Sequence, residues 1–103
     1  MFGLAVPHDL IIQPEAEAEL ADAYEWYDQR AQGLGNQFLL SVDAVLEAIA
    51  RNPHQFPKVF KAVRRALLPR FPYAIFFVVD GARIVVLAVF HGKRSPKRWK
   101  KRK

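Results

Sequence analysis

The spacing of apolar residues changes along the chain and divides it into elements. Residues 8–13 are short and isoleucine-rich and predict a strand; Pro14 directly after them suits the first position of a helix, where its missing N–H costs nothing. Apolar residues then recur every three or four positions up to the glycine-containing segment 33–35, and again from Phe38 to Ile49. This period predicts two helices joined by a short loop, and therefore an antiparallel hairpin.

After Asn52-Pro53 the apolar pattern becomes that of strands. Residues 53–60 contain two prolines and predict a loop. Strands are predicted at 61–68, 73–79 and 83–90, the last two joined by the tight-turn pair Asp80-Gly81. The predicted order is β-α-α-β-β-β. We therefore expect an α+β fold in which the helical hairpin covers one face of an antiparallel sheet, and the other face is partly shielded.

Length and composition limit the class of protein. A chain of 103 residues has room for one domain, expected over 1–103. The absence of cysteine excludes disulfides, thiolate metal sites and thiol nucleophiles, and it fits a reducing cytoplasm, which is the expected location. The longest apolar run, Ile84–Phe90, is far shorter than the ~18 residues of a membrane helix, and the apolar start lacks the basic residues of a secretory signal.

Charge is distributed unevenly between the two halves. Residues 1–57 contain two basic and nine acidic residues, a net charge of −7, whereas residues 58–103 contain fourteen basic residues and one acidic residue, a net charge of +13. This asymmetry predicts an acidic or nucleic-acid partner for the second half. The alternative is a solvated basic surface that ends in a basic tail.

The motifs of most enzyme classes are missing. The sequence has no glycine-rich phosphate loop, no HExxH or GxSxG motif and no carboxylate-rich calcium loop. Its three histidines lie too far apart in the sequence to indicate a local metal site, so we expect neither metal nor cofactor. The carboxylates at the start of the first helix favour a solvated face, stabilised by the helix dipole, over an acid–base pair.

Two groups of basic residues are the candidates for chemistry. They are Arg64 and Arg65 on the first strand of the sheet meander, and His91, Lys93 and Arg94 just past the end of the last strand. Consecutive antiparallel strands can bring the two groups onto one surface, although the adjacent Arg64 and Arg65 must face opposite sides of the sheet. With Trp99 they would suit an RNA backbone, or phosphodiester cleavage with His91 as acid or base. Alternatively, one arginine pairs with a carboxylate of the first helix, the other is exposed, and His91 is structural.

The second half also carries an extended residue pattern. It consists of Arg65, then RFPYAIFFV at 70–78, then IVVLAVFHGKRSPKRW at 84–99, and the first half adds Tyr24-x-Trp26-Tyr27 in an Ala/Glu-rich helix. This pattern resembles the RelE/ParE family of toxins from bacterial toxin–antitoxin operons, also described as plasmid stabilisation proteins. The resemblance covers about residues 9–99, which leaves 100–103 as a basic tail.

The resemblance implies a small toxin that is held inactive by a cognate acidic antitoxin. RelE-like members cut mRNA in the ribosome, whereas ParE-like members poison DNA gyrase. The resemblance to RelE-like nucleases would make Arg94 and Arg65 catalytic, with His91 as acid or base. However, Trp99 stands where those enzymes often place a tyrosine, and an indole has no hydroxyl to ionise. We therefore favour the ParE-like branch.

Two other functions stay open at this point. One is the ribosome-dependent endoribonuclease, so whether the chain is an enzyme is left undecided. The other is a non-toxic basic module that binds nucleic acid. The residues expected to meet the target or RNA are Arg64, Arg65, Lys93, Arg94, Lys97, Arg98 and Trp99.

Overall fold

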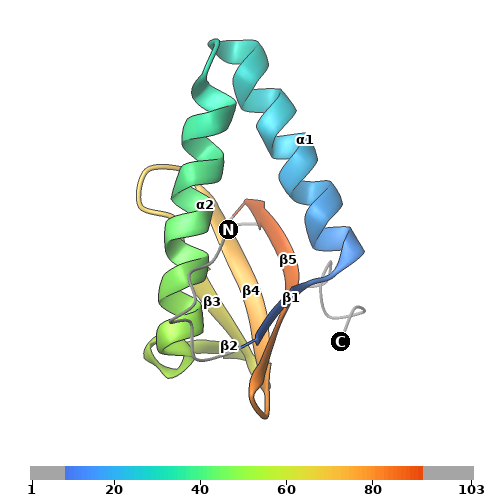
Figure 1. The fold of residues 1–103 in the computed structure, drawn as a ribbon, viewed down its shortest axis with the longest axis vertical. Coiled ribbons are helices and arrows are strands. Elements are labelled where there is room, and N and C mark those ends of the chain that lie inside the picture. Colours follow the sequence, from blue (N-terminus) through green and yellow to red (C-terminus); the bar gives the residue numbers. More distant parts are fainter. Residues whose placement is uncertain (1–8, 92–103) are drawn as a thin grey trace.

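Two α-helices and five strands form the part of the chain that the computed structural model describes, residues 9–91 (Figure 1). In chain order they are β1 (Asp9–Ile12), α1 (Pro14–Arg30), α2 (Leu34–Arg51), a 3-10 turn η1 (Pro53–Gln55), β2 (Lys58–Phe60), β3 (Val63–Leu67), β4 (Tyr73–Asp80) and β5 (Arg83–His91). The helices form an antiparallel hairpin against the sheet, which confirms the predicted α+β fold.

The sheet has the strand order β1-β5-β4-β3-β2. Strands β2 to β5 pair antiparallel with their neighbours, as predicted, whereas β1 lies parallel to β5. The first and last strands are therefore neighbours, although about seventy positions separate them in the sequence. The parallel pairing requires a long connection between the two strands, and the helical hairpin is part of it.

One strand was missed by the prediction. Residues 58–60 lie in the predicted loop 53–60 but form β2, so the order is β-α-α-β-β-β-β. The predicted strand 61–68 is shorter, at Val63–Leu67, because the chain reverses at Lys61, whose φ is 50°. Three residues next to a proline are too few to show an alternating pattern.

The joint between the helices is fastened by one side chain. The Asp28 carboxylate accepts hydrogen bonds from the backbone N–H groups of Gly33, at 3.1 Å, and Gly35, at 3.2 Å. Gly33 has a φ of 89°, the left-handed region that glycine adopts without strain. Since the first N–H groups of a helix lack partners within it, Asp28 satisfies two donors at the start of α2 and holds the hairpin closed.

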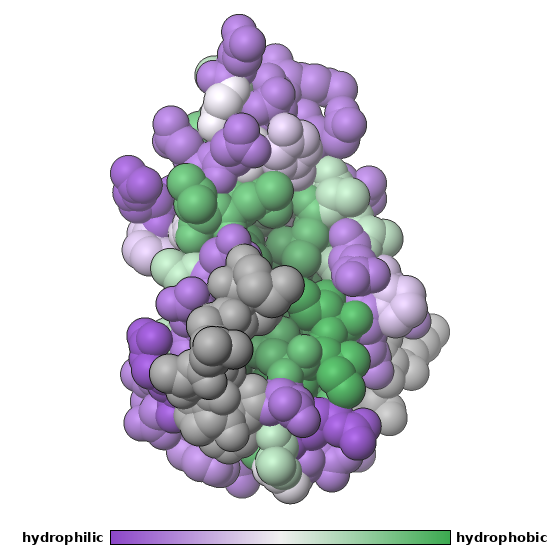
Figure 2. Space-filling view, in the orientation of Figure 1, coloured by the Kyte–Doolittle hydropathy of each residue, from purple (hydrophilic) through white to green (hydrophobic). Residues whose placement is uncertain are grey.

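Apolar residues lie on both faces of the sheet. The face under the helices joins strand residues such as Ile75, Phe77 and Val86 to Phe38 and other helix residues in one core cluster. The opposite face carries a second cluster whose buried members all belong to strands, Phe76 and Phe90 among them. In Figure 2 the tip of the hairpin is hydrophilic and apolar residues gather nearer the middle of the face. Within residues 9–91, neither helix has the length and apolar character that crossing a bilayer would require.

Candidate functional site

The strand register places the predicted site residues on both faces of the sheet. Arg65 lies opposite Phe76, whereas Arg64 lies opposite Phe77 and His91 lies opposite Tyr73. Residues directly opposite each other share a face, and successive residues along a strand alternate. Arg64 and His91 are therefore on the face covered by the helices, and Arg65 is on the other. One member of each predicted basic group, Arg64 and His91, thus shares a face, and the predicted opposition of Arg64 and Arg65 is confirmed.

Arg64 is used to hold the segment that precedes β2. Its Nη1 donates to the carbonyl oxygen of Phe56 at 2.6 Å and to that of His54 at 3.5 Å, while Nη2 lies 3.2 Å from Nδ1 of His54. A guanidinium bound to two backbone carbonyls fixes the path of the chain. Arg64 thus has a structural role that differs from the predicted alternative of an ion pair with the first helix.

Arg65 is half-buried on the opposite face. Its Nε is buried and has no hydrogen-bond partner among residues 9–91, and its backbone N–H donates to the carbonyl oxygen of Pro57 at 3.0 Å. The side chain lies in register with Phe76, a member of the second apolar cluster. Arg65 therefore anchors the β2–β3 region through its backbone, while its side chain lies on the sheet face that carries the second apolar cluster.

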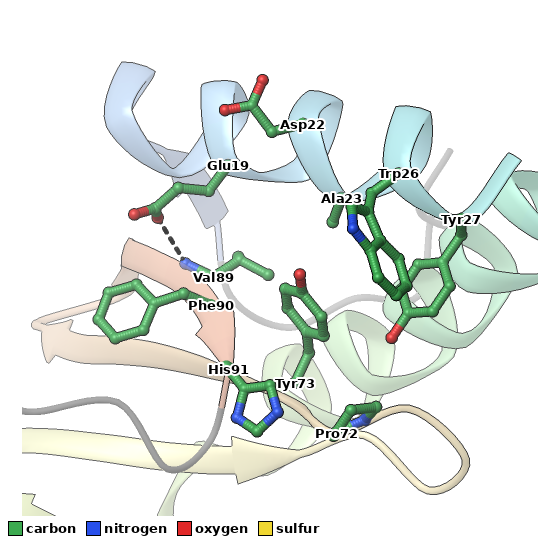
Figure 3. Close-up of a pocket in the computed structure, with 10 residues that line it drawn as sticks. All are labelled: Glu19, Asp22, Ala23, Trp26, Tyr27, Pro72, Tyr73, Val89, Phe90 and His91. Atoms are coloured by element: carbon green, nitrogen blue, oxygen red, sulfur yellow. Dashed lines mark hydrogen bonds between the residues drawn. The ribbon is translucent and has the colours of Figure 1, made fainter. Parts of the chain in front are cut away.

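His91 belongs to a groove that the sequence did not indicate. The groove has a volume of about 560 Å³ and lies between α1 and the adjoining ends of β4 and β5 (Figure 3). Its lining residues are Glu19, Asp22, Ala23, Trp26, Tyr27, Pro72, Tyr73, Val89, Phe90 and His91. Two residues of the motif Tyr24-x-Trp26-Tyr27, Trp26 and Tyr27, line the groove, but nothing in the sequence placed them beside His91.

Glu19 is not on a solvated face of the first helix, so the prediction made for the carboxylates of that helix is wrong for this residue. It is half-buried and its Oε1 accepts a hydrogen bond from the backbone N–H of Val89 at 2.9 Å (Figure 3). Strand β1 accompanies β5 only as far as Val86, where the N–H of Gln13 donates to the Val86 carbonyl. Glu19 therefore satisfies a strand-edge donor just beyond the point where β1 ends.

Aromatic rings form the wall of the groove nearest the hairpin tip. Tyr27 is 8% exposed and its ring centroid is 5.9 Å from that of Tyr73. Burial raises the pKa of the Tyr27 phenol above its ordinary value, and the nearby Tyr73 raises it further. Tyr27 is consequently a neutral hydrogen-bond donor at physiological pH rather than a base.

Trp26 lies on the rim of the same groove. It is 48% exposed, its ring packs edge-on against Tyr27 with centroids 5.1 Å apart, and the Arg30 guanidinium carbon lies 3.7 Å from the Trp26 ring centroid. Stacking by Arg30 and packing by Tyr27 hold an exposed indole in one orientation.

The remaining predicted site residues lie outside the described part of the chain. They are Lys93, Arg94, Lys97, Arg98 and Trp99. Within residues 9–91, no group of three or more histidine, aspartate or glutamate side chains gathers in a way that could hold a metal ion.

Comparison with solved structures finds relatives of the same fold. A chain of the chromosomal ParDE toxin–antitoxin system from P. aeruginosa superimposes with a TM-score of 0.74 at 20% identity, over 84% of this chain and 98% of that chain. A chain of the toxin–antitoxin complex RelBE2 from Mycobacterium tuberculosis gives a TM-score of 0.61 at 19% identity, over 84% of this chain and 99% of that chain. At these identities the similarity establishes the fold alone.

The sequence itself matches a family. No curated protein matches it. The family model for the ParE toxin of the type II toxin–antitoxin system parDE, however, matches residues 10–96, most of the chain, and thus confirms the family that the residue pattern resembles. The chain belongs to the ParE toxin family of type II toxin–antitoxin systems.

Proposed function

We propose that this protein is a toxin that a cognate antitoxin neutralises and that acts on DNA gyrase, without cutting RNA. The observation that carries the choice of target is the separation of Arg65 from His91 by the thickness of the sheet. Membership of the ParE family supports the same choice.

Cleavage of RNA needs groups that converge on one phosphate. A general acid or base must come within hydrogen-bond reach of the reacting atoms, and a cation must stabilise the charge that develops there. Arg65 and His91 face opposite sides, and Arg64 is already bound to the carbonyls of His54 and Phe56. The described residues of the nuclease hypothesis therefore do not support a shared reaction centre.

Charge supports an antitoxin as the partner. Residues 58–103 have a net charge of +13, and an acidic disordered segment would be attracted to them and would order on binding. The solved relatives are themselves components of toxin–antitoxin complexes. We propose that the target is bound by residues after β5. They are the residues in which the sequence concentrates cations close to a tryptophan: Lys93, Arg94, Lys97, Arg98 and Trp99.

The test measures the two activities side by side. The chain is induced in bacteria with and without its neighbouring antitoxin gene, plasmid supercoiling and gyrase-cleaved DNA are assayed, and mRNA cleavage is followed in a translation extract. We expect growth arrest without the antitoxin, with cleaved DNA and intact mRNA. Cleaved mRNA that disappears in His91→Ala would overturn the gyrase assignment, and normal growth without the antitoxin would favour the nucleic-acid-binding module.

A further inference from the structure

Arg65 carries a hydrogen-bond donor that residues 9–91 do not satisfy. Its Nε is buried and has no partner among these residues, although the side chain as a whole is only half-buried. The neighbouring Arg64 shows the usual arrangement, because its guanidinium donates to the carbonyl oxygens of His54 and Phe56. A buried donor of a charged group destabilises a fold when it lacks an acceptor, and native proteins rarely keep one. The Nε–H of Arg65 is therefore available to a ligand.

No carboxylate of the chain is placed to reach Arg65. All ten aspartate and glutamate residues of the sequence lie within residues 9–91. Six are in α1 and two in α2, and both helices pack on the other face of the sheet (Figure 1). The remaining two are Asp9, on the strand at the far edge of the sheet, and Asp80, at the end of β4 opposite Arg83. A carboxylate side chain for Arg65 must come from another molecule.

Apolar residues flank Arg65 on its face of the sheet. Phe76, which is 3% exposed, lies opposite it on β4, and Val63 lies two positions earlier on β3; both belong to the second apolar cluster. Leu67, two positions later on β3, shares this face and is 60% exposed. In surroundings of low polarity, a hydrogen bond between a guanidinium and an anion is stronger than in water. Arg65 and Leu67 thus place a cation beside an exposed apolar side chain.

This pair of side chains fits a carboxylate on a protein better than a nucleic-acid backbone. Successive phosphates are best matched by several cations, whereas the neighbours of Arg65 along this face of β3 are Val63 and Leu67. An extended protein segment can place a carboxylate and an apolar side chain on one side, because residues two positions apart point the same way. Arginine binds a carboxylate through two parallel N–H···O bonds, and Nε–H is one of the donors that can form them.

We propose that Arg65 binds a carboxylate side chain of a partner protein, and that an apolar residue two positions away in the partner covers Leu67. Binding gives the Nε–H its acceptor and removes the exposed leucine from water. The carboxylate site is independent of the proposed function, whereas the antitoxin as the source of the carboxylate rests on that function.

A short peptide tests the site in the full-length protein, which cell-free synthesis supplies without toxicity to a host. The probe is acetyl-Leu-Thr-Glu-Thr-Leu-amide, and its control is the same peptide with glutamine in place of glutamate. The NMR signal of the Arg65 Nε–H group shifts when this donor gains an acceptor. We expect the glutamate peptide to shift it saturably and the glutamine peptide to bind about tenfold more weakly, because a charged hydrogen bond is lost. Equal binding of the two peptides, or an unmoved Nε–H signal, would overturn the site.

Variants separate the guanidinium from general positive charge. Arg65→Gln should weaken binding of the glutamate peptide by about tenfold. Arg65→Lys should also weaken it, because an ammonium keeps the charge but lacks the planar pair of donors. Arg70→Gln removes an exposed charge elsewhere and should leave the affinity unchanged. The backbone N–H at position 65, which bonds to Pro57, reports in each variant whether β3 is folded. A folded Arg65→Gln protein that binds the peptide as tightly as the wild type would contradict the site.

An oligonucleotide tests the competing kind of ligand. Hexauridylate offers phosphates and no carboxylate, and we expect it to leave the Arg65 Nε–H signal in place. A shift as large as that caused by the glutamate peptide would overturn the assignment to a protein carboxylate. These measurements involve neither gyrase nor antitoxin, so their failure leaves the toxin assignment intact, and a failed gyrase assay leaves the carboxylate site intact.

Discussion

The close approach of the two helices at Gly35 requires a residue without a Cβ atom. A Cβ built at this position would lie 2.8 Å from two ring atoms of Tyr24 and 2.9 Å from the Tyr24 carbonyl oxygen. Real Cβ atoms do not approach backbone oxygen so closely, and the oxygen belongs to the rigid backbone of α1. The residue type at this position therefore controls how tightly α2 packs at the hairpin joint.

We expect Gly35→Ala to destabilise the protein. Alanine gains about 1 kcal/mol over glycine in helix propensity, but the overlap with Tyr24 costs about 1–3 kcal/mol and strains the joint as well. Denaturant unfolding measures the net loss. Asn36→Ala, at an exposed position of the same turn, is the control and should change stability little. A Gly35→Ala protein as stable as the wild type would mean that the helices separate freely.

The buried phenol of Tyr27 makes stability depend on alkaline pH. Burial, with Tyr73 nearby, raises the pKa of Tyr27 in the folded state, whereas in the unfolded chain it ionises near its ordinary value of about 10. Above that pH the unfolded state binds fewer protons than the folded state, so the free energy of unfolding falls as pH rises. Tyr27→Phe should show a shallower loss between pH 9 and about 11 in urea unfolding. Identical slopes in both proteins would contradict the assignment.

At the scale of elements, β2 depends on a side chain from the next strand. Arg64 on β3 binds the carbonyls of His54 and Phe56, and the Arg65 N–H bonds to Pro57, so the chain before β2 is held from β3. Without these bonds a strand of three residues has little to keep it paired.

We expect Arg64→Ala to loosen β2 without unfolding the sheet. The loss of charged hydrogen bonds to two carbonyls should cost about 1.5–3 kcal/mol, and the Arg65 amide should exchange with solvent faster because its acceptor, Pro57, moves. Hydrogen exchange followed by NMR measures this locally. Arg70→Ala removes the same charge at an exposed position and serves as the control. Unchanged exchange at Arg65 in Arg64→Ala would show that β2 holds itself.

At the scale of the whole molecule, acidic and basic residues are concentrated in different parts of the fold. The acidic residues lie mostly on the helical layer and the basic residues follow in the strands and beyond. We expect the affinity for the antitoxin to fall as salt rises, since much of the attraction acts between exposed charges. Calorimetric titration at about 0.05, 0.15 and 0.5 M salt, where the Debye length shrinks from more than 10 Å to below 5 Å, measures it. An affinity independent of salt would indicate an apolar interface instead.

The sequence was sufficient to predict the two helices, the longer strands and the family. Pro14 begins α1 as predicted, and the periods of three to four and of two separate helix from strand. The strand β2 could not be predicted, because three residues beside Pro57 are too few to show an alternating pattern. The parallel position of β1 beside β5 was equally hidden, since no local pattern records which edge a short strand joins.

The sequence by itself determined the helices and longer strands, the opposite net charges of the two halves, and the family. Each of these depends only on local periodicity, on composition or on a contiguous residue pattern. Only the tertiary structure decided which residues meet. The strand register turned Arg65 away from His91, and the packing of α1 on β5 joined Glu19 to Val89 and created the aromatic groove. The physical reason is that a single step along a strand reverses the face of a side chain, while contacts between distant elements depend on the packing of the whole core.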